Sequence, residues 1–222
     1  MKVIIFGATG MVGQGVLREC LIDSTVESVL TIVRSPTKQQ HAKLKTLIHQ
    51  DFNDFSLIKK ELAGYDACFF CLGVSSAGMT EQDYHRVTYD ITVAAARALA
   101  SVNPGMTFIY VSGAGTDSTE QGRMMWARVK GKTENALLRL PFKASYMFRP
   151  AFIQPMHGIV SKTKLYRAFY TVTGPLFPAL NRFFPRYVTT TEKVGQAMIR
   201  VARNGFPEPF LENRDINRIS QQ

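Results

Sequence analysis

Residues 2–13 read KVIIFGATGMVG, and this stretch decides the fold. Its apolar run VIIF ends at Gly7, which predicts a buried strand followed by a turn. Glycines recur every third residue at Gly7, Gly10 and Gly13, and residues 11–22 (MVGQGVLRECLI) continue as a predicted helix. Such a turn lets the backbone approach a pyrophosphate, and the helix N-terminus offers it free N–H groups. The segment Gly7, Thr9, Gly10, Met11, Val12 and Gly13 therefore predicts a dinucleotide-binding loop.

The alternation of strand and helix continues beyond this loop. Further strands are predicted at 28–33, 44–48, 66–72, 106–111 and 144–148, and helices at 54–63, 81–101, 124–140 and 192–203. Strands that are apolar on both faces and alternate with helices are typical of a parallel sheet covered on both sides. We therefore predict an α/β doubly wound parallel sheet, a Rossmann fold, with a polar C-terminal tail.

Length and composition fit one domain. The chain has 222 residues, of which 45% are hydrophobic and 20% charged. We expect a single domain, with a cofactor-binding core at 1–150 and a lid or substrate segment at 151–222. Three cysteines argue against a secreted disulfide scaffold. The first apolar run is too short for a signal-peptide core, and no apolar run reaches the ~18 residues of a membrane span, so we predict a cytoplasmic protein.

Positive charge is concentrated in one part of the chain. The net charge is +10, and residues 135–191 hold eight basic residues and no acidic one. This favours an anionic partner, an acidic protein or a lipid surface, although a plain solvated surface stays open. Nucleic acid is disfavoured because no recognised binding module is present. The aromatic, basic stretch 159–187 is interpreted as a substrate lid, as a membrane- or protein-binding surface, or as the rest of the core.

Residues at other strand ends indicate which dinucleotide binds. Arg34 ends the second predicted strand, where an arginine suits the 2′-phosphate of NADP and an acidic residue suits NAD. We predict NADP(H) as the preferred cofactor, while NAD stays compatible with the sequence. Asp51 and Phe52 follow the third strand and are predicted to border the adenine. Leu72 and Gly73 follow the fourth, where the cofactor would pass.

The motifs together resemble the atypical short-chain dehydrogenase/reductase superfamily, close to its NmrA-like and epimerase-like proteins. The resemblance covers about residues 1–204 and is carried by GATGMVG (7–13), VR (33–34), CLG (71–73), VSGAG (111–115), WARVKGKTE (126–134) and RPAF (149–152). It implies that Lys130 holds the nicotinamide ribose and that Ser112 orients a substrate carbonyl. It also implies that the carboxamide meets the segment Pro150, Ala151 and Ile153, where Ala151 and Ile153 can donate N–H groups.

One catalytic position departs from the superfamily's pattern. Its tyrosine, four residues before the lysine, is replaced by Trp126, whose indole cannot relay a proton. Loss of general acid–base help costs about 10²–10⁴-fold in rate. Other candidate proton donors are Tyr84, His85, Tyr89, His157 and Tyr166, although a structural role is the commoner one for each.

Two interpretations of function follow. The first is an oxidoreductase or epimerase-like enzyme acting on a small carbonyl or hydroxyl compound, with Ser112, Trp126 and Lys130 at its site. The second is a non-catalytic NADPH-binding regulator that acts on a partner through residues 135–191. We predict no metal site, because Cys68 and Cys71 lie three apart on a strand and so face opposite sides. The helices at 81–101 and 124–140 suit either a homodimer interface or the interior.

Overall fold

The predicted first strand, β1 (Lys2–Phe6), is an interior strand of a parallel sheet in a computed structural model that describes residues 1–160 and 186–222. Within this part of the chain the strand order is β3-β2-β1-β4-β5-β6-β9, and every neighbouring pair is parallel. The predicted doubly wound Rossmann fold is confirmed. The other strands of this sheet are β2 (Ser28–Val33), β3 (Leu44–Ile48), β4 (Ala67–Phe70), β5 (Thr107–Val111), β6 (Ala144–Arg149) and β9 (Phe210–Glu212).

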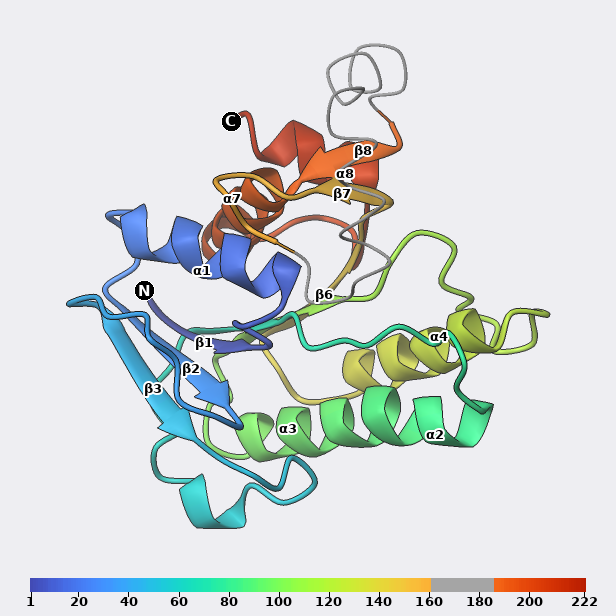
Figure 1. Cartoon of the computed structure of the whole chain (residues 1–222), viewed down its shortest axis with the longest axis horizontal. Helices are drawn as coiled ribbons and strands as arrows, with labels where there is room; N and C mark the ends of the chain where they lie inside the picture. Colours follow the sequence, from blue (N-terminus) through green and yellow to red (C-terminus); the bar gives the residue numbers. More distant parts are fainter. Residues whose placement is uncertain (161–185) are drawn as a thin grey trace.

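Helices cover both faces of the sheet (Figure 1). One face carries α1, α7 and α8, and the other carries α2, α3 and α4. Their bounds are α1 (Met11–Ile22), α2 (Glu81–His85), α3 (Ile91–Ala100), α4 (Met125–Leu138), α7 (Thr191–Asn204) and α8 (Asn213–Ile219). A separate two-stranded sheet pairs β7 (Phe152–Gln154) with β8 (Val188–Thr190).

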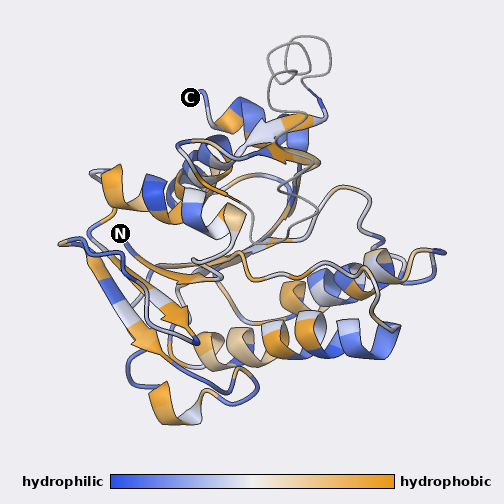
Figure 2. Ribbon diagram, viewed as in Figure 1, coloured by the Kyte–Doolittle hydropathy of each residue, from blue (hydrophilic) through white to orange (hydrophobic). Residues whose placement is uncertain are grey.

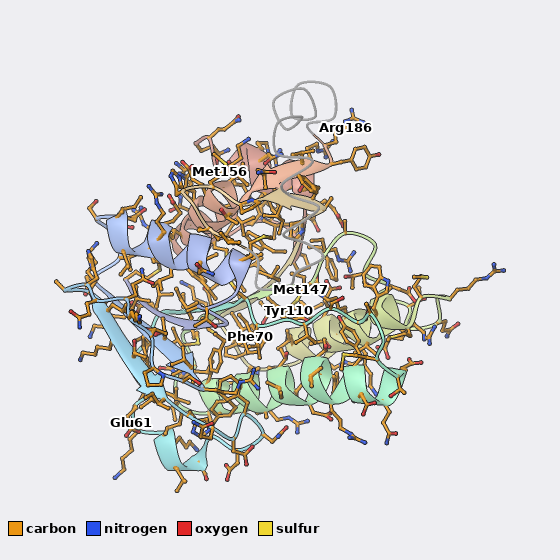
Figure 3. All side chains as sticks on the ribbon, viewed as in Figure 1. Glu61, Phe70, Tyr110, Met147, Met156 and Arg186 are labelled. Carbon is orange, nitrogen blue, oxygen red and sulfur yellow. The ribbon has the colours of Figure 1, made fainter. Side chains whose placement is uncertain are left out.

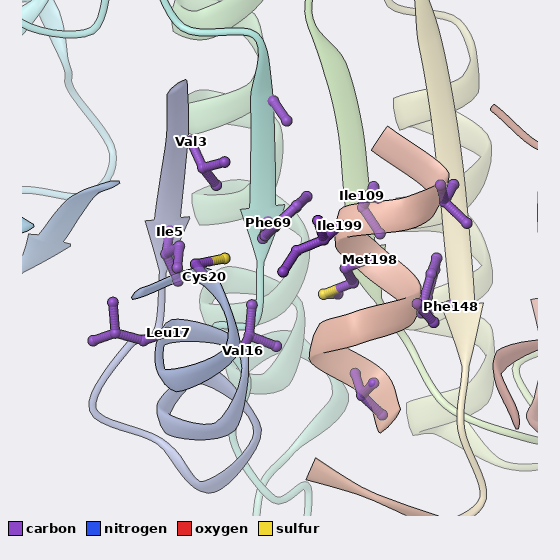
Figure 4. Packing of buried hydrophobic residues seen from close by; sticks show 14 of the residues in the cluster. Val3, Ile5, Val16, Leu17, Cys20, Phe69, Ile109, Phe148, Met198 and Ile199 are labelled. Carbon is purple, nitrogen blue, oxygen red and sulfur yellow. The ribbon is translucent and has the colours of Figure 1, made fainter. Parts of the chain in front are cut away.

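The core consists of two layers, one on each face of the sheet. Figure 4 shows Val16 and Cys20 of α1 and Met198 of α7 packed over Phe69 and Ile109. The opposite layer lies against α3 and α4. Figure 3 shows its row of Phe70, Tyr110 and Met147, which are register partners on β4, β5 and β6.

Glycines allow α1 and α7 to pack closely against each other. A Cβ on Gly15 would lie 2.5 Å from the Thr191 Cβ, and one on Gly195 would lie 2.7 Å from Cγ of Glu19. The buried Glu19 carboxylate accepts hydrogen bonds from Arg18 at 2.5 Å and from Gln196 at 3.2 Å. This contact fixes the helix that follows the glycine loop.

The predicted helix at 54–63 is wrong. Only a short 3₁₀ helix, η1 (Ser56–Ile58), forms there. The Asp54 carboxylate accepts hydrogen bonds from the Ser56 N–H at 2.8 Å and from its hydroxyl at 3.0 Å, and such local bonds compete with helix formation. Phe55 and Leu62 still enter the core, so the segment covers the sheet as an irregular chain.

The structure differs from the prediction in four further places. The expected helix at 81–101 contains a π-helical turn, η2 (Arg86–Asp90), between a hydrophilic α2 and a more hydrophobic α3 (Figure 2). Strand β3 is not apolar on both faces, because it lies at the sheet edge with Lys45 and Thr46 exposed. The expected polar tail instead forms β9 and α8, and β7 and β8 were also not predicted.

Candidate functional site

The glycine loop, which connects β1 to α1, leaves almost no space for a side chain at Gly7 or Gly13. Gly7 has a left-handed φ of +77°, and a Cβ there would lie 2.5 Å from the Leu72 backbone nitrogen. A Cβ on Gly13 would lie 2.1 Å from the Gly7 carbonyl oxygen, so α1 begins directly against the turn. Gly10 is the N-cap residue, and no side chain caps this helix end, which leaves N–H groups at Met11 and Val12 for a phosphate. The loop fits a dinucleotide pyrophosphate.

A cavity of about 220 Å³ opens beside this loop, at the carboxyl ends of β1 and β2. Five of the predicted cofactor residues line it, namely Gly7, Thr9, Arg34, Phe52 and Leu72. Sequence reasoning missed its other lining residues, which are Ala8, Ile32, Val33, Ser35 and Pro36. Three of these five, Ala8, Val33 and Ser35, are chain neighbours of a predicted residue, so the motifs located most of this wall of the cavity.

Arg34 lies at the mouth of this cavity with an exposed side chain. Its backbone carbonyl accepts a hydrogen bond from Gln50 Nε2 at 2.7 Å. Across the described residues 1–160 and 186–222, no acceptor or carboxylate pairs with its guanidinium. The positive charge is therefore available to an anion entering the cavity.

The neighbouring residues Asp51 and Phe52 have different surroundings in the structure. Phe52 lines the cavity and packs edge-on against Phe6, with ring centroids 6.0 Å apart. Asp51 is exposed, does not line the cavity and accepts a hydrogen bond from the Asn53 N–H at 2.9 Å. This is the geometry of a turn. Gly73, just beyond β4, is exposed, and a Cβ there would meet nothing within 4 Å.

A second group of predicted residues lies further along the same sheet edge, where β5 ends. Trp126, Lys130 and Glu134 are spaced four residues apart on α4 and so share one face of the helix. This face contacts the loop after β5: Lys130 Nζ donates to the Ser112 backbone carbonyl, and the six-membered ring of Trp126 lies against Gly115. The structure thus brings the three predicted catalytic residues together.

Ser112 is buried, and its hydroxyl already donates a hydrogen bond within the protein. Its Oγ donates to Oε1 of Glu134 at 2.5 Å. The Glu134 carboxylate, fully buried, also accepts from Arg149 Nε at 3.0 Å and Nη2 at 2.5 Å. Sequence reasoning missed this network. No spacing in the sequence signals it, because Ser112 follows β5, Glu134 lies in α4 and Arg149 ends β6.

Burial changes the proton affinity of Lys130. Loss of solvent around its ammonium lowers the pKa from 10.5 to about 8, although the nearby Glu134 carboxylate opposes this shift. The side chain therefore stays mainly charged at neutral pH.

The alternative proton donors lie in other surroundings. Tyr84 is buried on α2. His85 Nδ1 pairs with Asp90 at 3.3 Å, its Nε2 lies 3.1 Å from Lys132 Nζ, and Tyr89 packs on its ring at 4.6 Å. His157 Nε2 contacts Glu192 at 2.9 Å. Tyr166 lies outside the described residues.

The predicted carboxamide segment has one donor in use. The Ala151 N–H donates to Asn213 Oδ1 at 3.2 Å, which ties the end of β6 to α8. Pro150 is buried, and its carbonyl accepts from the Ala114 N–H at 2.9 Å, while Ile153 is buried in β7.

Other features of the described residues give no further cofactor. Cys68 and Cys71 pack into opposite core layers, and Cys20, Cys68 and Cys71 are free thiols. No group of metal-binding side chains occurs in residues 1–160 and 186–222. No described helix is long and apolar enough to cross a membrane. Of the basic segment, Lys162, Lys164, Arg167 and Arg182 lie outside the described part, as does most of 159–187.

Comparison with known proteins agrees with this geometry. The profile of a family described as "NAD(P)H-binding" matches residues 7–139. A short-chain dehydrogenase/reductase family oxidoreductase from Burkholderia thailandensis superposes with a TM-score of 0.68 at 14% identity, covering 100% of this chain and 95% of its own. The enzyme WbmF from Bordetella bronchiseptica, solved with NAD⁺, gives 0.65 at 14% identity and covers 99% and 77%. At this identity the likeness shows the fold alone.

Curated relatives span nearly the whole chain. One is 27% identical over 94% of this chain and 90% of its own, and is "Protein FMP52-2, mitochondrial" from Scheffersomyces stipitis. Another is 26% identical over 100% and 96%, and is "Protein FMP52, mitochondrial" from Meyerozyma guilliermondii. These names contradict the expected cytoplasmic location, which was inferred only from missing targeting signals.

Proposed function

This chain belongs to the NAD(P)H-binding family, and from that premise we propose that it is an oxidoreductase that uses NADP(H) in preference to NAD(H). The observation that carries the preference is the guanidinium of Arg34, which has no hydrogen-bond or ion-pair partner among residues 1–160 and 186–222 and lines the cavity beside Gly7 and Thr9. Guanidinium matches the 2′-phosphate of NADP in geometry and charge. The 2′-hydroxyl of NAD would leave that charge unused.

The residues of the chain would hold the nucleotide along the carboxyl edge of the sheet. The N-terminus of α1 would bind the pyrophosphate, and Phe52 with Pro36 would border the adenine end. Lys130, charged at neutral pH, holds the ribose near the reacting end. Bound NADPH supplies a hydride. Trp126 and Ser112 do not supply the matching proton, because the indole is not an acid and the serine hydroxyl donates to Glu134.

Nucleotide titration tests this proposal. Trp126 is the chain's single tryptophan, so quenching of its emission reports binding at the site. A charge-assisted hydrogen bond contributes about 2 kcal/mol, or roughly thirtyfold in affinity. Arg34→Ala should therefore weaken NADPH binding about thirtyfold and leave NADH binding unchanged. Arg97→Ala, at an exposed position in α3, is the matched control. If the wild type binds NADH as tightly as NADPH, the preference is refuted.

Trp126 in the tyrosine position favours a second candidate, a regulator that binds NADPH without turnover. The two differ in one measurement: an oxidoreductase consumes NADPH when given an acceptor, and a regulator does not. Binding without consumption across ketones, aldehydes and conjugated acceptors would support the regulator.

A further inference from the structure

Trp126 presents two binding groups that no residue of 1–160 or 186–222 uses, beside the predicted reaction site. Its side chain is half-buried, and only the edge of its six-membered ring faces Gly115. Within residues 1–160 and 186–222, its indole N–H has no acceptor and its ring has no aromatic or cationic partner. An aromatic ring and a hydrogen-bond donor that are both partly enclosed and both free suit a flat ligand that carries a carbonyl oxygen.

Within the part of the chain that the structure describes, no side-chain hydroxyl is hydrogen-bonded to the indole of Trp126. Ser112 Oγ donates to Glu134. Tyr110 lies in the core and Tyr146 bonds the backbone of Phe206. Lys130 Nζ is fixed on the Ser112 carbonyl. This end of the sheet can bind and orient an acceptor better than it can protonate one.

Acceptors differ in how much they need a proton donor. Hydride addition to an aliphatic carbonyl gives an alkoxide, whose conjugate acid is about as weak an acid as water, so a general acid must protonate it during the step. Hydride addition to a quinone gives a hydroquinone anion, whose conjugate acid is a phenol with a pKa near 10. The difference is about six orders of magnitude in acidity, so the hydroquinone anion forms without a general acid.

We propose that Trp126 makes this site selective for quinone-type acceptors, by stacking on the ring and donating its indole N–H to one carbonyl oxygen. The proposal rests on the proposed oxidoreductase function and names its acceptor class. The balance is complete: one hydride brings two electrons, the quinone becomes the hydroquinone anion, and water supplies the final proton. The ammonium of Lys130 stays protonated throughout.

The test compares acceptors and variants. Duroquinone is the probe, because its four methylated ring positions resist thiol addition, and an aliphatic aldehyde is the comparison. With NADPH, the wild type should reduce duroquinone with a kcat/KM at least about 100 times that for the aldehyde. Trp126→Tyr restores a phenol four residues before Lys130 and should raise aldehyde reduction about 10²-fold. Trp126→Phe keeps a ring but removes the N–H, and should weaken duroquinone binding about tenfold.

Binding gives a readout independent of turnover. Calorimetric titration of duroquinone into protein saturated with NADP⁺ should give a saturable isotherm with wild type, and none with Trp126→Ala. Leu138→Ala, at an exposed position on the same helix, should bind as wild type. If NADPH itself fails to bind, the proposed function falls. If NADPH binds but duroquinone does not, or if the wild type reduces the aldehyde as fast as duroquinone, the acceptor assignment alone is overturned.

Discussion

The buried ion pair between Glu134 and Arg149 gives the sharpest test of how α4 is held against the sheet. Glu134 has no exposed surface, and its carboxylate accepts bonds from Ser112 and from two nitrogens of Arg149. Removing one partner of a buried pair costs about 3–5 kcal/mol, because the other charge stays buried without compensation.

The two single replacements should differ in cost. In Glu134→Gln, the Arg149 guanidinium keeps Ser118 Oγ at 2.6 Å and Glu212 at 3.5 Å, so we expect a loss of about 3 kcal/mol. In Arg149→Met, the fully buried carboxylate keeps the hydrogen bond from the Ser112 hydroxyl and the nearby charge of Lys130 but loses both bonds from Arg149, and the loss of packing on the Phe210 ring adds to the cost. We expect a loss of about 5 kcal/mol there.

Urea unfolding followed by far-UV circular dichroism measures both values. The double variant Glu134→Gln with Arg149→Met removes both charges of the pair, and should lose less than the sum of the two single variants by at least about 2 kcal/mol. Nucleotide titration of each folded variant then separates stability from binding. A Glu134→Gln loss below about 1 kcal/mol, or strictly additive losses, would refute the reasoning.

Three other predictions concern separate parts of the molecule. Gly13→Ala should abolish NADPH binding and destabilise the fold, whereas Gly73→Ala, with open space around the new methyl, should leave unfolding unchanged and weaken NADPH binding alone. The pKa of Lys130 lies near 8 instead of 10.5, so between these pH values the unfolded chain binds more protons and wild-type stability rises with pH. Relative to Lys130→Met, urea unfolding at both ends of this window should show a wild-type gain of up to about 3 kcal/mol, and a flat difference would contradict the shift. Thr190→Ala removes the side-chain cap of α7 and should lower the free energy of unfolding by about 1 kcal/mol, measured by thermal denaturation.

The sequence predicted those parts of the molecule that depend on neighbours along the chain. The loop at Gly7, Gly10 and Gly13 could be located because its geometry is local, and the strands followed from their apolar runs. Strand β9 was missed because three residues carry no periodicity, and the strand exists only as a partner of β6. The start of α8 did carry a signal, since Glu212 and Asp215 form a capping box.

In the candidate site too, the sequence predicted features that depend on near neighbours along the chain and missed contacts between distant residues. The spacing of Trp126 and Lys130 on one helix predicted their shared face. The commitment of the Ser112 hydroxyl to Glu134 depends on a side chain 22 positions away, and that of Glu134 to Arg149 on one 15 away. No spacing rule relates these positions, because β5, α4 and β6 meet only in the folded sheet.

The packing of α1 against α7 also affects how the chain is made. Glu19 and Gln196 touch across 177 positions, so the apolar side of the first helix meets its cover only after nearly the whole chain has left the ribosome. Until then the apolar face of the first helix stays exposed to solvent beside the glycine loop. Contacts between residues so far apart in the sequence form slowly, and the exposed apolar surface promotes aggregation until they form. The chain should therefore need chaperone help during synthesis, and a premature stop before α7 should yield inclusion bodies and no smaller soluble nucleotide-binding fragment.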